Sequence, residues 1–167
     1  MTQQTMTEID AFRNTFEKEY QTTRKLLHAY PAAKADMKPH EKLKSAQELA
    51  WMLTLNQMVP VPALDMEKLD GSGLPKAPTT WSEVLAMFDK AHKGTNARLQ
   101  RITDAEWNGS LQMPQGPKQM GSMRRGEALW FFLHDTIHHR GQFSTYLRLA
   151  GAKVPSIYGP SADEPWV

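Results

Sequence analysis

Apolar residues recur at helical spacing in four long stretches of the chain. In the first stretch, from about Thr7 to Tyr30, they follow three-, four- and seven-residue steps: Ile9, Phe12, Phe16, Tyr20, Leu27 and Tyr30. This periodicity is typical of a helix with one apolar face. Thr7 and Asp10 have the spacing of a capping box, and Pro31 prevents the helix from continuing. The pattern therefore predicts a helix between Thr7 and Tyr30.

Three further helices are predicted by similar patterns. The second covers about 45–60, the third about 80–103 and the fourth about 125–150. The second and third each begin with a Ser or Thr three residues ahead of a Glu, which is a capping box. Gly151 follows the fourth, at the position where a left-handed residue commonly ends a helix.

The segments between these helices are long and read as irregular. Residues 60–79 and 108–124 are rich in proline and glycine, so both are predicted to be loops, the first a long crossover between bundle halves. Three prolines in the tail, 154–167, predict extended backbone. No stretch is typical of a strand. The expected fold is therefore all-α: one domain, 1–167, forming an antiparallel four-helix bundle with long inter-helix loops and an extended C-terminal tail.

Composition agrees with one globular domain and excludes several classes of function. The chain has 167 residues, 40% of them hydrophobic and 23% charged, and it has no cysteine. Disulfides, thiol nucleophiles and cysteine-held metals are thus excluded. A net charge of +2, evenly spread, does not favour nucleic-acid binding. Neither a signal peptide nor an apolar run of about 20 residues is present, so we expect a cytoplasmic protein with no membrane partner.

The fourth helix carries the candidate chemistry. Its segment H-D-T-I-H-H-R-G-Q places His134 four residues before His138, and Asp135 four residues before His139. Either pair shares one helical face and has the spacing of two metal ligands. On a wheel of about 100° per residue, taking Arg140 as a mark of the solvent side, Asp135 and His139 point into the bundle. On this wheel His138 flanks that face and His134 lies at its edge.

An inward carboxylate needs a partner, because burying it alone is costly. Two alternatives satisfy Asp135: a metal ion shared with His139, or an internal ion pair with that histidine and no metal. Gln142, on the same face, is able to satisfy buried polar groups in either case. On the same wheel Phe132 and Phe143 are core aromatics. His28, His40 and His92 are expected to be surface or packing residues.

The fourth predicted helix and the tail that follows it resemble those of a known family. The run L-H-D-T-I-H-H-R-G-Q-F-S-T-Y-L-R, followed by Y-G-P-S, is similar to the C-terminal helix and tail of the DinB family. These are the damage-inducible, YfiT-like bundle proteins, described as metalloenzymes. The strong resemblance covers about 127–166. A weaker one covers 39–52, where P-H-E-K-L-K-S-A-Q-E-L-A-W is similar to the start of the family's second helix.

This resemblance implies a four-helix bundle, often a homodimer, with a divalent metal held by three histidines. One histidine comes from the second helix and two, four residues apart, from the fourth. The last corresponds to His139, its partner to Asp135, and the second-helix ligand to Met52. One of the three family ligands is thus retained as histidine. A third ligand would have to come from Glu48 or Asn56, from His138 if the helix is rotated, or from water.

The resemblance implies two alternatives for function. One is a metal-dependent thiol transferase or hydrolase that uses zinc or nickel and a low-molecular-weight thiol, with Gln142 and Tyr146 lining the substrate pocket. The other is a metal-free bundle that binds a small molecule or serves as a structural and dimerisation module. A homodimer is expected in both cases, from the resemblance and because several apolar residues of the fourth helix lie off the Asp135 face and need cover from the proline-rich tail, a loop or a second subunit. They are Leu129, Trp130, Leu133 and Ile137.

Overall fold

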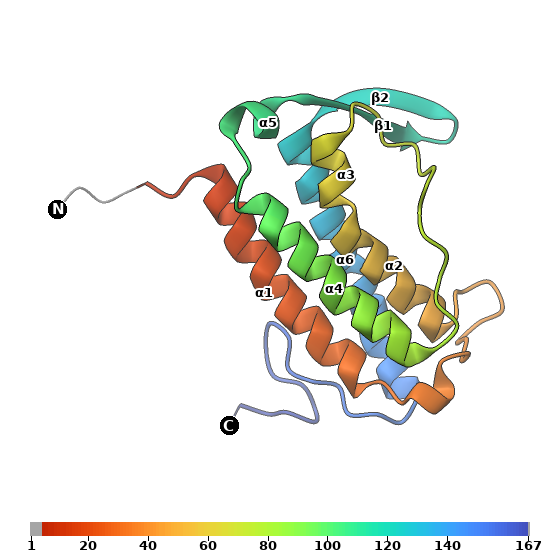
Figure 1. Ribbon diagram of the computed structural model, residues 1–167. Coiled ribbons are helices and arrows are strands. Elements are labelled where there is room, and N and C mark those ends of the chain that lie inside the picture. The colour runs from red at the N-terminus through yellow and green to blue at the C-terminus, as the bar shows by residue number, and fades with distance from the viewer. Residues whose placement is uncertain (1–4, 167) are drawn as a thin grey trace.

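The computed structural model describes residues 5–166 and is dominated by four long helices (Figure 1). Three short helical elements and one β-hairpin lie between them. In chain order the elements are α1 (Glu8–Ala29), a 3-10 turn (Ala32–Lys34), α2 (Ala46–Met58), α3 (Pro60–Asp65), α4 (Trp81–Leu99), α5 (Asp104–Asn108), β1 (Ser110–Gly116), β2 (Gln119–Arg124) and α6 (Arg125–Leu149).

The predicted helix boundaries are confirmed where local capping sets them. Thr7, Ser45 and Thr80 are the N-caps of α1, α2 and α4, and each forms a reciprocal capping box with the third residue of its helix. Just after the C-terminal end of α6, Gly151 has φ +73°. There the amide of Ala152 donates to the Leu147 carbonyl at 3.0 Å, which closes the helix as the glycine predicts.

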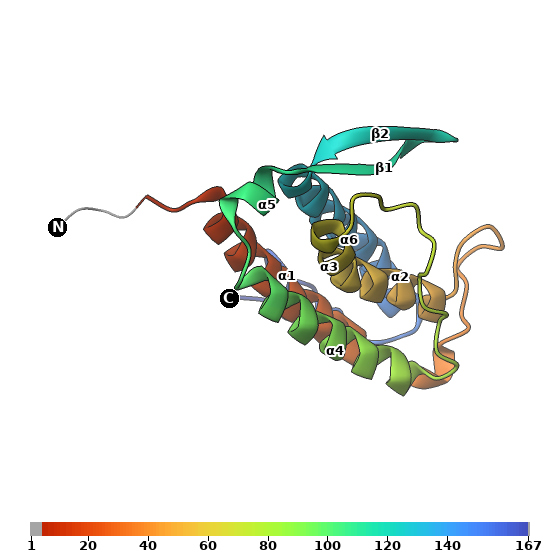
Figure 2. The ribbon, with the colours of Figure 1, turned by 45° about the horizontal axis from the view of Figure 1, so that its top comes forward.

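The four long helices form a bundle, but not a simple antiparallel one (Figures 1 and 2). Each of α1 and α2 packs against both α4 and α6. The start of α1, the end of α2, the end of α4 and the start of α6 meet in one apolar cluster at the same end of the bundle. Consequently α2 runs parallel to its neighbour α4, and α1 parallel to α6. The prediction of a purely antiparallel arrangement is wrong for these two pairs, because the connection after α2 crosses back along the bundle.

That connection also contains a short helix where a loop was predicted. Pro60 and Pro62 lie in the first turn of α3, where a helix needs no amide donor, so neither proline disrupts it. Likewise α4 ends at Leu99, earlier than the predicted 103, and Thr103 then caps the short α5. Residues 59–62, with the sequence V-P-V-P, therefore begin a helix.

A β-hairpin replaces the loop predicted over 108–124, so the fold is not purely α-helical. β1 pairs antiparallel with β2, and a bulge interrupts the register between Pro114 and Gly116. Leu111 and Met113 point into the bundle and are buried, whereas Gln112 between them is exposed. This alternation identifies the hairpin as a cap on one end of the apolar core.

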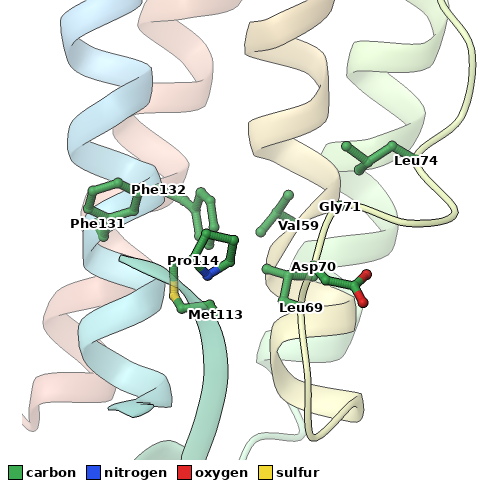
Figure 3. Close-up of a pocket in the computed structure, with 9 residues that line it drawn as sticks. All are labelled: Val59, Leu69, Asp70, Gly71, Leu74, Met113, Pro114, Phe131 and Phe132. Carbon is green, nitrogen blue, oxygen red and sulfur yellow. The ribbon is translucent and has the colours of Figure 1, made fainter. Parts of the chain in front are cut away.

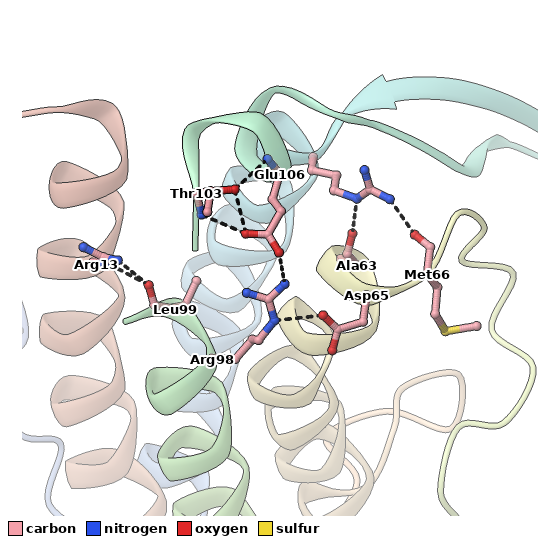
Figure 4. Close-up of polar contacts among 9 residues, drawn as sticks. Arg13, Ala63, Asp65, Met66, Arg98, Leu99, Thr103 and Glu106 are labelled. Carbon is pink, nitrogen blue, oxygen red and sulfur yellow. Dashed lines mark hydrogen bonds and ion pairs between the residues drawn. The ribbon is translucent and has the colours of Figure 1, made fainter. Parts of the chain in front are cut away.

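Polar contacts attach the short elements to the bundle (Figure 4). Arg98, near the end of α4, donates to Asp65 of α3 at 2.8 Å and to Glu106 of α5 at 2.6 Å. Arg125, the first residue of α6, donates to the carbonyl oxygens of Ala63 and Met66. These two arginines hold α3, α5 and the following loop at the hairpin end of the molecule.

The C-terminal segment folds back on itself instead of extending as predicted. Asp163 accepts a hydrogen bond from the Val154 amide at 2.8 Å and forms an ion pair with Arg148 of α6. Glu164 accepts from the Ser156 amide and pairs with Lys25 of α1. The two carboxylates therefore hold the segment in a loop against α1 and α6.

The buried interior consists of two apolar clusters separated by a polar layer. One cluster lies at the hairpin end, around Phe12, Leu99 and Leu129, and the other at the opposite end, around Leu27, Trp81 and Phe143. Between them lie eight buried polar side chains from all four long helices: Glu19, Thr23, Thr54, Gln57, His92, Thr95, Thr136 and Arg140. None of the helices in the described part of the chain is long and apolar enough to cross a membrane.

Candidate functional site

The α6 helix turns a different face to the core from the one predicted. Its inward positions follow alternating four- and three-residue steps: Leu129, Leu133, Thr136, Arg140, Phe143 and Leu147. Arg140 is 1% exposed, so taking it as a mark of solvent rotated the predicted face. Asp135 and His139 accordingly lie at the edge of the buried face, with side chains 32% and 17% exposed. The prediction that they point into the core is corrected to this half-buried position.

Arg140 is tolerated in the core because its charge is paired. Its guanidinium donates to the Glu19 carboxylate of α1 and, at 2.5 Å, to the hydroxyl of Tyr158. The guanidinium also lies 5.1 Å from the centre of the Tyr158 ring, a cation–π arrangement. The arginine of H-H-R-G-Q and the tyrosine of Y-G-P-S thus contact each other, and both bind Glu19.

The apolar residues that were expected to need a partner subunit are largely covered within the bundle. Leu129 and Leu133 are buried in the hairpin-end cluster, and Trp130 packs edge-on against Phe12 with ring centres 5.1 Å apart. Ile137 is half-buried. Cover within the chain, one of the three expected sources, therefore accounts for most of these residues, and the homodimer remains a prediction.

A polar cluster joins α2 to α6 at the edge of the core. Asn56 of α2 donates its side-chain amide to Asp135 Oδ2 at 2.8 Å. The other carboxylate oxygen, Oδ1, lies 3.3 Å from His139 Nε2. Both oxygens of Asp135 consequently lie next to a protein nitrogen, and Asn56 donates a hydrogen bond to one of them.

Gln142 extends this cluster along α6. Its carbonyl oxygen lies 3.2 Å from His139 Nδ1, and its amide nitrogen donates to His138 Nε2 at 3.0 Å. Because a carbonyl oxygen only accepts, Nδ1 of His139 carries a proton, and Nε2 is the nitrogen that faces Asp135. His138 and His134 are exposed on the outer side. His139 therefore presents Nε2 to the Asp135 carboxylate, at 3.3 Å from Oδ1.

These residues do not fit a three-histidine metal centre. Asp135 and His139 are adjacent potential ligands, but Asn56 points its amide nitrogen, a donor, toward them. Met52 lies one turn before Asn56 on the same side of α2 and offers a neutral thioether, a weak ligand for zinc. Within residues 5–166, no group of three His, Asp or Glu side chains is arranged to hold a metal ion.

The other residues considered from the sequence lie away from this cluster. Glu48 lies two turns before Asn56 and caps α2 by accepting from the Ser45 amide. It is therefore too far from Asp135 and His139 to serve as the third metal ligand. Tyr146 is buried in the cluster opposite the hairpin, and its hydroxyl donates to the Lys44 carbonyl at 2.8 Å. Burial raises the pKa of that hydroxyl.

An apolar cleft that was not predicted from the sequence begins one helical turn from the polar cluster. It has a volume of about 280 Å³ and lies between α2, α6, β1 and the loop after α3 (Figure 3). Phe132 of α6 lines the cleft and lies three residues before Asp135. Val59, at the end of α2, also lines it and lies three residues after Asn56. The remaining lining residues are Leu69, Asp70, Gly71, Leu74, Met113, Pro114 and Phe131. The arrangement provides an apolar cleft, with the polar cluster one helical turn away along α2 and α6.

Comparison with known proteins supports the likeness found in the sequence. The model of the DinB family matches residues 1–166. A stretch of 76 residues is 33% identical to the uncharacterized protein YrdA of Bacillus subtilis, covering 46% of this chain and 45% of that protein. The chain thus matches less than half the length of this relative.

Solved structures show the same fold at low sequence identity. A DinB-like protein from Bacillus cereus superposes with a TM-score of 0.72 at 18% identity, over 89% of this chain and 97% of that one. YfiT from Bacillus subtilis superposes with a TM-score of 0.64 at 15% identity, over 92% and 94%. YfiT is described as a probable metal-dependent hydrolase with an unusual four-helix bundle topology.

Proposed function

This chain belongs to the DinB family, and from that premise we propose that it is a small-molecule-binding member whose metal centre is degenerate. In this proposal the cleft between α2 and α6 holds the ligand, and the Asn56–Asp135–His139 cluster forms its polar edge. Met52 and Asp135 occupy the places where the family resemblance implies histidines. The three-ligand centre that catalytic zinc sites usually have is then incomplete.

The observation that carries the proposal is the mutual satisfaction of the polar groups. Asn56 donates to one oxygen of Asp135, and His139 faces the other at 3.3 Å. Gln142 in turn engages the second nitrogen of His139. A metal ion at Asp135 and His139 would have to replace the contact between them, and it would gain two protein ligands. Two ligands on one helix favour weak binding at most.

A second candidate, a metal-dependent hydrolase or thiol transferase, is favoured by the orientation of His139. Metal-bound histidines commonly donate their other ring N–H to a carbonyl or carboxylate oxygen. In the same way, the Gln142 carbonyl oxygen accepts the hydrogen bond from Nδ1 of His139, and Nε2 is directed at Asp135. Asp135 and His139 would hold the zinc or nickel ion, which would supply Lewis acidity toward a bound water or thiol.

Calorimetric zinc titration at fixed pH separates the two candidates. The protein as it stands should bind zinc weakly or not at all, whereas Met52→His should raise the affinity by at least about tenfold, the lower end of what surrounding residues alone contribute. In that background Asp135→Ala or His139→Ala should abolish the gain. The matched control is His134→Ala, because His134 is exposed and stacks on Trp130 instead.

The opposite result is equally clear. Tight, stoichiometric zinc or nickel binding by the unmodified protein would overturn the degenerate centre and favour the hydrolase or transferase. Equal zinc affinity of the unmodified protein and Met52→His would show that Met52 does not face the Asp135–His139 pair.

A further inference from the structure

We propose that the cleft between α2 and α6 binds a small, uncharged aromatic molecule. The inference rests on the proposed function, since it takes the bundle to be a binding protein, and it adds the chemical class of the ligand. Three features of the cleft carry it: the nature of its walls, the charges around it, and its size and rigidity.

The walls of the cleft are aromatic and sulfur-bearing as well as aliphatic. The rings of Phe131 and Phe132 are 5.4 Å apart at 79°, an edge-to-face pair. Figure 3 shows Phe132, Met113 and Pro114 on one side of the cleft, opposite Val59 and Leu69. A flat ring inserted between these sides would meet a phenyl ring, a proline ring and a thioether, all of which pack favourably on aromatic systems.

The charges around the cleft disfavour an anion. Among the described residues that line it, Asp70 is the one charged side chain, and no Lys, Arg or His is included. Asp70 is itself paired with Lys68 at 3.0 Å and accepts from the Ser72 amide, so neither charge is free for a ligand. The Asp135 carboxylate, one helical turn from Phe132, accepts a hydrogen bond from Asn56 and lies 3.3 Å from His139 Nε2. A charged ligand would lose its hydration without gaining an ion pair.

The cleft is small, and its walls are held in place before any ligand binds. Its 280 Å³ lies near the lower end of the range for ligand sites, about 300–1,000 Å³, which suits a molecule of two or three aromatic rings. The loop wall is fixed to β1, because the Leu69 amide donates to the Gln112 carbonyl and the Gln112 amide donates to that of Glu67, at 2.8 and 2.9 Å. A preformed apolar wall lowers the entropic cost of binding.

The test uses two fluorescent probes that share one aromatic framework and differ in charge. N-phenylnaphthylamine is uncharged, and anilinonaphthalene sulfonate carries an added sulfonate. The full-length protein should bind the uncharged probe saturably, with one site per chain. The sulfonate should bind at least about tenfold more weakly, which corresponds to about 1.4 kcal/mol.

Two substitutions with matched controls assign the binding to the cleft. Phe131→Ala removes a lining ring that is 51% exposed, so the protein stays folded, and the dissociation constant for the uncharged probe should rise about three- to tenfold. The control is Leu149→Ala, at a 56% exposed apolar position of the same helix outside the cleft. Leu74→Lys places a cation at the rim and should strengthen sulfonate binding, whereas Leu43→Lys, at an equally exposed leucine, should not.

Several outcomes would overturn the proposal. They are no saturable binding of the uncharged probe, equal binding of both probes, or the same loss in Phe131→Ala and Leu149→Ala. Probe binding that falls as a dimer forms, measured by light scattering over a concentration series, would make a second copy of the chain the occupant. None of these results bears on zinc affinity, so failure here and failure of the degenerate-centre proposal are distinguished.

Discussion

The hydroxyl of Tyr158 donates a hydrogen bond of 2.8 Å to the carboxylate of Glu19, a residue 139 positions earlier in the chain. Glu19 lies in the middle of α1 and is buried, whereas the Tyr158 ring is largely exposed. The same hydroxyl accepts from Arg140. One buried carboxylate therefore joins α1, α6 and the C-terminal segment, and the segment provides a contact that the buried ion pair needs.

Tyr158→Phe should destabilise the protein by about 1.5–3 kcal/mol, the usual range for a hydrogen bond to a charged group. The ring is mostly exposed, so the loss comes from the hydroxyl and not from packing. Urea denaturation of both proteins measures the difference. Tyr30→Phe is the control, because its hydroxyl donates to an uncharged carbonyl, that of Lys34, and should cost about 0.5–1.5 kcal/mol. Equal losses would show that Glu19 does not depend on Tyr158.

Arg140→Met should destabilise more strongly, by about 3–5 kcal/mol, because it leaves the Glu19 carboxylate buried without its cation. The double variant Glu19→Leu/Arg140→Met removes both charges and should recover much of this loss. A double-mutant cycle by chemical denaturation measures the coupling. Additive losses from the two single variants would contradict the pairing.

Stability should fall as the pH drops through about 6.5, because of His92. Burial lowers the pKa of His92, although the neighbouring Glu17 carboxylate acts in the opposite direction. Below pH 6.5 the unfolded chain therefore binds a proton that the folded protein binds less readily. Above pH 6.5 the stabilising contribution is fully present.

His92→Gln should flatten this part of the stability curve, measured as the midpoint of urea unfolding from pH 8 to pH 5. The loss belongs to His92 if it starts near pH 6.5, since the lowered pKa of Glu17 gives a loss only below about 4.5. An unchanged slope in the variant would assign the effect to another group.

Phe143→Ala and Phe132→Ala should differ, although both were predicted from the sequence to empty the core. Phe143 is fully buried between Tyr30 and Trp81, so its loss should cost about 3–5 kcal/mol. Phe132 is half-buried and faces the cleft, so its loss should cost less than half as much. Thermal unfolding of the two variants at the same pH makes the comparison.

Features fixed by local interactions were predictable from the sequence. The caps at Thr7, Ser45 and Thr80 each depend on a residue three positions away, and Gly151 depends on its own backbone. Such signals need no knowledge of which helices touch. Features that depend on tertiary partners were less accessible.

The inward face of α6 is the main example. A helical wheel treats an arginine as a solvent-facing residue, and the partner that buries Arg140 lies on a distant helix. A usable signal was nevertheless present in the four- and three-residue spacing from Leu129 to Leu147, which passes through Arg140. On α1 the buried face likewise runs from Phe16 through Glu19, which places a carboxylate at a core position. Two opposite charges at core positions of two helices predict a buried pair.

The hairpin and the cleft were missed for different reasons. In β1 the alternation of Leu111 and Met113 with polar residues is a strand pattern, but the surrounding glycines and prolines favoured a loop. The cleft combines Val59, Leu69, Met113 and Phe132 from four separate segments. No pattern along the chain brings these residues together.

The polar layer across the bundle has a consequence for how the protein opens. Each apolar cluster is stabilised by its own packing contacts. The layer between the clusters is joined by hydrogen bonds, such as that from the Thr95 hydroxyl to the Gln57 carbonyl. We therefore expect the molecule to open as two cooperative units stacked end to end. Amide protons in the hairpin-end unit should exchange with solvent as one group, separately from those around Trp81 and Phe143. A ligand in the cleft would slow exchange in the first group alone.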